Sequence, residues 1–251
     1  MLKNVKSSYF TQLIFSDISE RRKLKLLKHN KNLQKEMNIN LINYKFFSLR
    51  YIEYESDKKG REYFGIDDSL RYEGEYLNGE RNGKGKEYNW RGELRFEGEY
   101  KNGKRNGNGK EYDNEGNIEF EGEYLNGERN GKGKEYDYDG KLKFEGEYLN
   151  GKRNGKGKEY DYNGKLKFEG EYLNWERNGK AKEYGFCGQI EFEGEYLNGE
   201  RWNGKRKKYN FYDELELEEE YLNGKKWNGK GKEYAGCLIF ETEYLNGDKI
   251  W

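Results

Sequence analysis

Polar and apolar residues alternate along much of this 251-residue chain. In the segment 141–148, Leu142, Phe144 and Tyr148 fall on one side together with a glycine, while lysine and glutamate occupy the other side. Alternation with a period of two is typical of a β-strand that buries one face. The segment therefore predicts a half-buried strand.

A second strand and two turns follow in each unit of the pattern. The segment 156–162 predicts a strand with Tyr160 and Tyr162 on one side. The dipeptide Asn163-Gly164 then favours a type I′ turn, whose two central residues both have positive φ. The opposite connection, 149–155, is longer and holds two Asn-Gly pairs. Successive hairpins therefore predict an antiparallel β-meander.

An internal repeat of 24 residues organises most of the chain. The motif (Phe/Tyr)-Glu-Gly-Glu-Tyr begins at Tyr72, Phe96, Phe120, Phe144, Phe168 and Phe192. A degenerate copy begins at Leu217 after Trp202 is inserted, a half repeat occupies 240–251, and a degenerate first copy occupies 51–71. We predict that residues 51–251 form an all-β array of hairpin repeats in which each repeat packs on its neighbours.

Aromatic residues at fixed repeat positions are the predicted core of this array. They are Tyr76, Phe96, Tyr100, Phe120, Tyr124, Phe144, Tyr148, Phe168, Tyr172, Phe192 and Tyr196. Hydrophobic residues make up only 32% of the chain, so the core must be thin, and aromatic side chains supply much of its apolar area. The glycine between the two aromatic positions of each strand is expected to leave room for rings of neighbouring strands.

The first 50 residues differ from this pattern. Segment 1–50 has no glycine and carries eleven basic against three acidic residues, an excess of eight positive charges that the rest of the chain cancels to a net charge of zero. Leucines near helical spacing predict a helix over 20–37. We place a domain boundary near residue 50, between a small basic helical head and the repeat array.

Three interpretations of the head stay open. It could be a helical cap that covers the first strands and protects an exposed sheet edge. It could be a basic surface helix that contacts anionic phospholipid or a partner. The candidate contact residues are Arg21, Arg22, Lys23, Lys25 and Lys28. A third interpretation comes from a resemblance given below.

Candidate chemistry is sparse. One histidine and two cysteines supply neither a zinc cage nor a catalytic triad, and Cys187 and Cys237 stand two repeats apart, so separate thiols are expected. The segment 82–86 has turn spacing rather than that of a phosphate-binding loop, and the glutamate columns are expected to be solvated. Because the tyrosines are predicted on the core face, no nucleic acid is expected as a partner. We predict no enzyme activity, cofactor or metal.

Two further absences bear on location. The sequence shows no secretory signal, and no run approaches the about 18 apolar residues of a membrane span. We therefore expect a cytoplasmic protein, with a peripheral membrane location as a variant of that expectation.

The segment 72–85, Tyr-Glu-Gly-Glu-Tyr-Leu-Asn-Gly-Glu-Arg-Asn-Gly-Lys-Gly, resembles the MORN (membrane occupation and recognition nexus) repeat. That repeat has the pattern Y-x-G-x-W-x-x-G-x-x-x-G-x-G; here Tyr76 replaces the usual Trp, and Asn82 stands where many members have His. The variant is also similar to the repeats of bacterial YwqK-type proteins, described as antitoxins. The segment 10–37 faintly resembles an F-box, without its leading Leu-Pro.

The MORN resemblance implies a scaffold for protein contacts and membrane tethering. Together with the basic head, it predicts a non-enzymatic interaction protein that binds protein partners, with anionic membrane as a further candidate partner. The alternatives are a ubiquitin-ligase substrate adaptor, implied by the F-box-like head, and an antitoxin-like or kinase-regulatory repeat protein.

Overall fold

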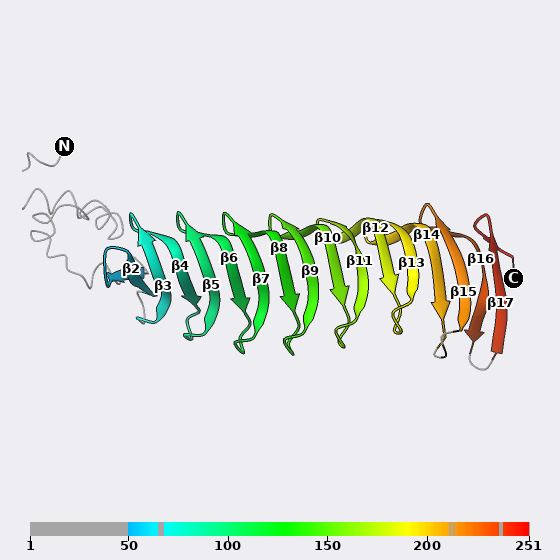
Figure 1. Cartoon of the computed structure of the whole chain (residues 1–251), viewed down its shortest axis with the longest axis horizontal. Coiled ribbons are helices and arrows are strands. Elements are labelled where there is room, and N and C mark those ends of the chain that lie inside the picture. The colour runs from blue at the N-terminus through cyan, green and yellow to red at the C-terminus, as the bar shows by residue number, and fades with distance from the viewer. Residues whose placement is uncertain (1–49, 65–67, 211, 213, 236–237, 251) are drawn as a thin grey trace, which may run out of the picture. The chain divides into compact units, whose positions relative to one another are not determined.

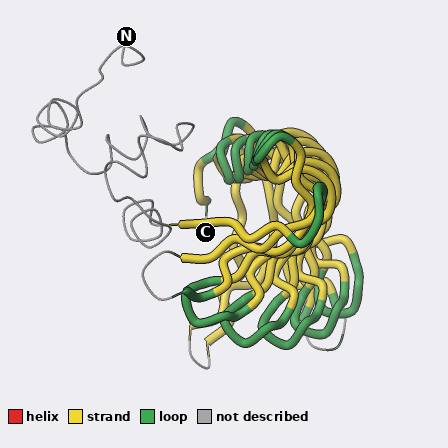
Figure 2. Tube along the Cα trace, turned by 90° about the vertical axis from the view of Figure 1, so that its left-hand side faces the viewer, coloured by secondary structure: helices red, strands yellow, loops and turns green. Residues whose placement is uncertain are grey.

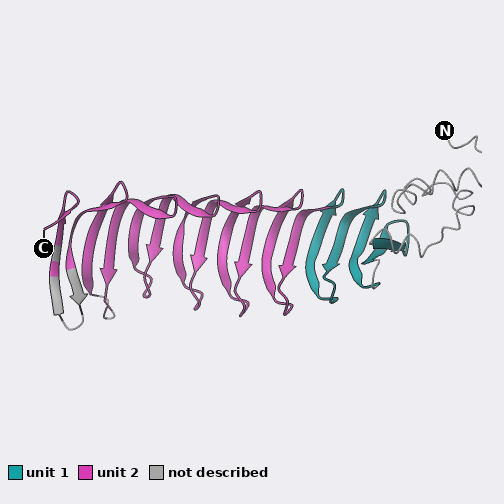
Figure 3. Ribbon diagram, turned by 180° about the vertical axis from the view of Figure 1, so that it is seen from behind, with its two compact units in different colours: residues 1–103 teal, residues 104–251 magenta. Residues whose placement is uncertain are grey.

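The computed structural model describes residues 50–64, 68–210, 212, 214–235 and 238–250. These described residues form eighteen β-strands and no helix (Figure 1). The helix expected over 20–37 lies outside them. The chain divides into two compact units, residues 1–103 and 104–251 (Figure 3).

The first unit contains five strands among its described residues. They are β1 (Arg50–Tyr54), β2 (Lys59–Phe64), β3 (Leu70–Leu77), β4 (Glu80–Tyr88) and β5 (Leu94–Lys101). Each strand pairs antiparallel with the next along the chain. The degenerate first copy therefore also forms an antiparallel hairpin, with a longer connection over 55–58.

The described part of the second unit continues this pattern through thirteen strands. They are β6 (Lys104–Tyr112), β7 (Ile118–Leu125), β8 (Glu128–Tyr136), β9 (Leu142–Leu149), β10 (Lys152–Tyr160), β11 (Leu166–Leu173), β12 (Glu176–Tyr184), β13 (Ile190–Leu197), β14 (Glu200–Tyr209), β15 (Leu215–Leu222), β16 (Lys225–Ala235), β17 (Leu238–Leu245) and β18 (Asp248–Lys249). Every consecutive pair is antiparallel. The predicted antiparallel meander is confirmed.

The tight turns lie at the opposite ends of the hairpins from where the sequence predicts them. Between β9 and β10, only Asn150 (φ 50°) and Gly151 (φ 79°) separate the paired residues Leu149 and Lys152. Two central residues with positive φ define a type I′ turn. The longer connection expected over 149–155 is therefore wrong, because β10 already begins at Lys152.

The connection from β10 to β11 is a three-residue loop rather than a type I′ turn. The Gly164 N–H donates to the Asp161 carbonyl (2.9 Å) and the Asp161 N–H to the Lys165 carbonyl (2.8 Å), while Asn163 keeps a negative φ. This is a type I turn followed by a left-handed glycine. The Asp161 carboxylate accepts the N–H groups of Asn163 and Lys165, which favours this loop over the predicted one.

Irregular pairing bends the strands. Pairing between β9 and β10 passes from Tyr148–Arg153 directly to Gly146–Gly157, so residues 154–156 of β10 form a bulge. Bulges bend a strand and increase its twist. The strands accordingly curve along their length (Figure 2).

The eleven aromatic side chains predicted as the core are all buried, and Tyr72 is buried with them. The Phe144 ring lies directly against two facing glycines: a Cβ on Gly146 would stand 2.7 Å from the tip of the ring and one on Gly157 2.6 Å. Tyr148 and Tyr172 meet the same ring edge to face, with centroids 5.9 and 5.3 Å away. The glycines leave the room that the sequence predicts, and each ring joins neighbouring hairpins.

Candidate interaction surface

Two groups of predicted residues fall partly or wholly outside the description. Arg21, Arg22, Lys23, Lys25 and Lys28 all precede the first described residue. Cys187 is an exposed free thiol, whereas Cys237 is not described. The contacts proposed for the head therefore remain predictions.

A row of ion pairs runs beside the buried aromatic rings. The Arg153 guanidinium donates to Glu135 (Nε–Oε1 3.1 Å), and the Tyr148 hydroxyl donates to the same carboxylate (2.6 Å). The guanidinium carbon lies 3.9 Å from the centroid of the Phe144 ring. Cation–π contact and ion pairing therefore cover the ring from one side. The expectation of solvated glutamate columns is wrong for this column.

The next repeat has the same geometry. Arg177 donates to Glu159 at 2.5 Å, the Tyr172 hydroxyl donates to that carboxylate at 2.6 Å, and the guanidinium stacks over Phe168. A signal in the sequence was available: this position is arginine in six consecutive repeats, whereas lysine fills most other basic columns. Arginine presents a planar fork that suits bidentate pairing and stacking on a ring.

Burial and pairing set the ionisation of this row. Burial by itself would raise the pKa of Glu135, but hydrogen bonds from Arg153 and Tyr148 outweigh it and hold the pKa below its ordinary value. Burial, the hydrogen bond to Glu135 and the charge of that carboxylate raise the pKa of Tyr148. The carboxylate is therefore ionised and paired inside the array, where it stabilises the fold.

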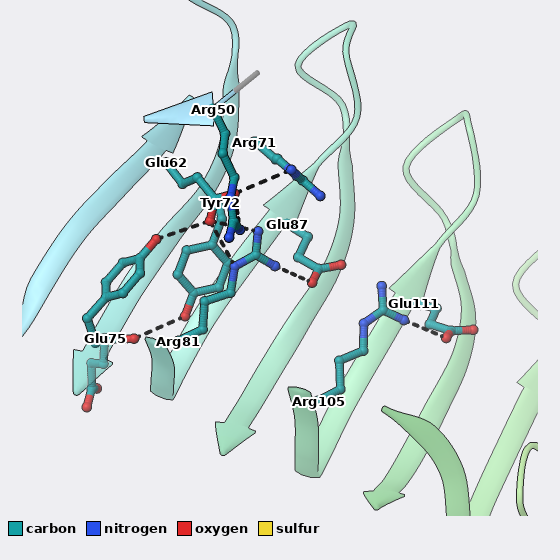
Figure 4. Close-up of polar contacts among 10 residues, drawn as sticks. Arg50, Glu62, Arg71, Tyr72, Glu75, Arg81, Glu87, Arg105 and Glu111 are labelled. Carbon is teal, nitrogen blue, oxygen red and sulfur yellow. Dashed lines mark hydrogen bonds and ion pairs between the residues drawn. The ribbon is translucent and has the colours of Figure 1, made fainter. Parts of the chain in front are cut away.

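The first unit builds the same network from its degenerate copy (Figure 4). Glu62 is 1% exposed and lies 3.1 Å from Arg81, 3.3 Å from Arg50 and 3.5 Å from Arg71. The Tyr76 hydroxyl also points toward it, at 3.5 Å. Three arginines therefore surround this one buried carboxylate of the first unit.

The second tyrosine of each repeat lies on the face away from the core. The Tyr160 hydroxyl donates to Glu145 (2.7 Å) on that face, and burial together with this bond raises the pKa of Tyr160 to about 12. The prediction that Tyr160 shares the core face is wrong, because Gly157 and Glu159 face the core, against the Phe144 ring and the Tyr172 hydroxyl, and alternation places Tyr160 on the other face. Tyr162 is outside the strand altogether.

Exposed aromatic rings mark three consecutive three-residue loops of the second unit. Tyr138, Tyr162 and Phe186 are 86%, 71% and 63% exposed, and they occupy the same position in successive repeats. The Lys141 ammonium donates to the Tyr162 carbonyl (2.9 Å), and the Lys165 ammonium to the Phe186 carbonyl (3.1 Å). Each loop is thereby tied to the next. We call Tyr138, Tyr162 and Phe186 the aromatic edge.

The sequence prediction missed the aromatic edge because it assigned Tyr162 to a strand. The loop residue carries no partner in the core, and its ring projects where a partner molecule can reach it. Large exposed aromatic side chains are over-represented at protein interfaces. The edge is the candidate interaction surface of this unit.

Comparison with known proteins agrees with the repeat pattern. The MORN repeat model matches residues 72–89, 96–118, 120–141 and 144–165. The chain therefore contains four MORN repeats, and the predicted MORN resemblance is confirmed. The YwqK-type and F-box-like resemblances stay predictions. No curated protein matches the chain.

Likenesses to solved structures are weak. They include the TcdB2-TccC3-TEV protein (10% identity, 80% of this chain, 11% of that chain, TM-score 0.20) and a porin-like protein from Bacteroides uniformis (13%, 80%, 56%, TM-score 0.16). A third is a mutant of S. aureus TarM in complex with fondaparinux, α-GlcNAc-glycerol and UDP (11%, 70%, 26%, TM-score 0.16). The chain spans only 11% to 56% of these proteins. TM-scores this low carry no argument about function.

Two further searches concern metals and membranes. Within the described ranges, no group of three or more His, Cys, Asp and Glu side chains is placed to hold a metal ion. In the same part of the chain, no segment forms a helix of the length and apolarity needed to cross a membrane.

Proposed function

We propose that this chain is a non-enzymatic scaffold that binds a protein partner along its aromatic edge. The observation that carries the proposal is the repetition of an exposed ring at one loop position, in Tyr138, Tyr162 and Phe186. Two strands per repeat separate successive rings by about 10 Å. An extended partner segment could therefore meet several rings at once.

The surroundings of the rings support a binding role. The ammonium of Lys165 lies 4.5 Å from the centroid of the Phe186 ring and also holds the carbonyl of that residue. A loop fixed in this way loses little conformational freedom on binding, which favours affinity. Aromatic residues at the centre of an interface commonly carry much of its binding energy.

Affinity capture with matched variants tests this proposal. The triple variant Tyr138→Ser, Tyr162→Ser and Phe186→Ser should lose a partner that the wild-type chain retains. The control is the triple variant Lys132→Ser, Lys156→Ser and Lys180→Ser, whose side chains are exposed on the strands rather than on the loops. Equal retention by all three proteins, with unfolding midpoints unchanged, would show that the edge does not bind.

A second candidate function is contact of the head with anionic membrane. Its support is the excess of eight positive charges in residues 1–50, since each basic residue near an anionic surface adds about 1 kcal/mol. Salt-sensitive flotation of the full chain with phosphoinositide-containing vesicles, lost when Arg21, Arg22, Lys23, Lys25 and Lys28 are all replaced by glutamate, would support it. Flotation that survives these substitutions would rule out the head as the contact.

A further inference from the structure

The type I′ turns place a row of leucines at the other ends of the hairpins. In the second unit, the residue before each turn is Leu125, Leu149, Leu173, Leu197, Leu222 or Leu245, and each is well exposed. We call these six residues the leucine edge. Successive members again stand about 10 Å apart. Such a row repeats an exposed apolar side chain at the margin of a polar face.

One turn within this row departs from the others. Trp175 occupies the second turn position with φ 81°, where the other described type I′ turns have Gly79, Gly103, Gly127, Gly151, Gly199, Gly224 and Gly247. A bulky residue in the left-handed region is strained by about 1–2 kcal/mol. Trp175 is also 46% exposed, and its one ring contact among the described residues, with the Arg153 guanidinium carbon, is distant at 5.9 Å.

The fold does not require tryptophan at this position, because glycine forms the same turn elsewhere in the chain. The backbone N–H of Trp175 donates to the Arg153 carbonyl as the equivalent glycines do one repeat away. Strain that the fold does not need, at an exposed aromatic residue, points to a contact outside the hairpin. Tryptophan is among the residues most enriched in interface hot spots.

The charges beside the leucine edge have a symmetric pattern. The residue after each turn of the second unit is, in order, Lys104, Glu128, Lys152, Glu176, Glu200, Lys225 and Asp248. Counted in turns from Glu176, residues equally many turns before and after it carry opposite charges. The three pairs are Lys152 and Glu200, Glu128 and Lys225, and Lys104 and Asp248. All seven side chains are exposed, and among the described residues none makes an ion pair.

We propose that a second copy of this chain docks antiparallel on the leucine edge, with the two-fold axis at Trp175. A two-fold contact uses one patch twice and must be self-complementary. The antiparallel arrangement places Lys152 beside the partner's Glu200 and Glu128 beside the partner's Lys225. Only Glu176 meets its own copy, at the axis.

A parallel arrangement would set every one of these charges against its own copy. Exposed ion pairs contribute only about 0.2–1 kcal/mol each, so they select the orientation while Trp175 and the leucines supply the affinity. The leucine edge and the aromatic edge lie at opposite ends of the hairpins. The dimer is therefore independent of the proposed function and leaves the aromatic edge open.

Sedimentation equilibrium of the full chain under reducing conditions tests the proposal, since the reductant excludes a disulfide through Cys187. We expect a mass twice that of the 30.1 kDa chain. Trp175→Gly should weaken the dimer by about 30-fold or more, while the unfolding midpoint of the monomer, measured at a concentration below dimer formation, rises because the strain is removed. Tyr162→Ser, on the aromatic edge, should leave the dimer unchanged.

Charge exchange tests the orientation. Lys152→Glu or Glu200→Lys alone should weaken the dimer several-fold, and the double variant should restore it. A wild-type monomer at tens of micromolar, a dimer that survives Trp175→Gly, or a double variant weaker than both single variants would overturn the proposal. Binding of a wild-type monomer to neutral lipid vesicles, lost in Trp175→Gly, would make the edge a membrane contact and overturn it as well.

Discussion

Two regions of the second unit fill the phenylalanine and glycine positions of the strand motif in different ways. In the regular repeats a phenylalanine such as Phe144 rests on glycine and is fully buried. In β15 the corresponding residues are Leu217 and Glu219. Glu219 is 1% exposed and lies 3.0 Å from Arg206 and 2.5 Å from Lys226.

The comparison shows that one backbone pattern accepts either a ring or an ion pair. The smaller Leu217 makes room, and the charged Glu219 brings two cations with it. The energetic consequences differ, because a missing ring leaves a cavity, whereas a missing carboxylate leaves the half-buried cations Arg206 and Lys226 without this partner. Each region can therefore be broken in its own way.

Removal of a ring should have the largest effect. Phe144→Ala is expected to lower the free energy of unfolding by about 3–5 kcal/mol, since facing glycines cannot fill the cavity. Chemical denaturation of the full chain measures the loss. Tyr162→Ala, at an exposed loop position, is the control and should change stability by no more than about 0.5 kcal/mol. Unchanged stability of Phe144→Ala would show that the strand faces are assigned wrongly.

Removal of the buried carboxylate of Glu219 should have the next largest effect on stability. Glu219→Ala is expected to cost about 3 kcal/mol, because Arg206 is left half-buried and unpaired. The double variant Glu219→Leu with Arg206→Met should recover most of the loss, since apolar packing commonly replaces a buried ion pair at no cost. If the double variant is no more stable than Glu219→Ala, the site depends on charge rather than on filled volume.

Relief of the strain in the turn at Trp175 should give a smaller effect, a gain in stability. Trp175→Gly should raise the free energy of unfolding of the monomer by about 1 kcal/mol, because the left-handed conformation suits glycine. Thermal unfolding at a concentration below dimer formation measures it. Asn150→Ala, at another left-handed turn position, is the opposite control and should be destabilised.

The smallest effect concerns alkaline pH. Burial and a hydrogen bond to a glutamate raise the pKa of Tyr136, Tyr160 and Tyr184 to about 12, from an ordinary value of 10.0. The unfolded chain loses these protons first, so stability should fall as pH rises from 10.0 toward 12. Tyr160→Phe should make that fall shallower. Unfolding midpoints measured from about pH 8 to pH 11 will show whether the slope changes.

The alternation of polar and apolar residues was enough to predict the antiparallel meander and the burial of residues such as Phe144 and Tyr148. The turns were harder, because the dipeptide Asn163-Gly164 favours a type I′ turn in isolation while the Asp161 carboxylate holds a different loop. The face of Tyr160 was also hard to predict, because the core side of β10 carries Gly157 and the ion-paired Glu159 rather than apolar side chains.

The candidate site was the least predictable part. Tyr162 was predicted as a strand tyrosine because the predicted strand ran two residues beyond Tyr160, where β10 ends. The pairing of Arg153 with Glu135 depends on a contact between residues 18 positions apart. Such contacts follow from how hairpins stack rather than from local spacing. The basic residues of the head stay predictions.

Hydrogen exchange measured strand by strand in Phe144→Ala and the wild-type chain is the most direct test of how the array is held together. If each ring joins only neighbouring hairpins, amides of β9, β10 and β11 should lose protection while those of β14 and β15 keep it. An equal loss of protection throughout the described strands of the second unit would contradict this, and would mean that the rings form one indivisible core.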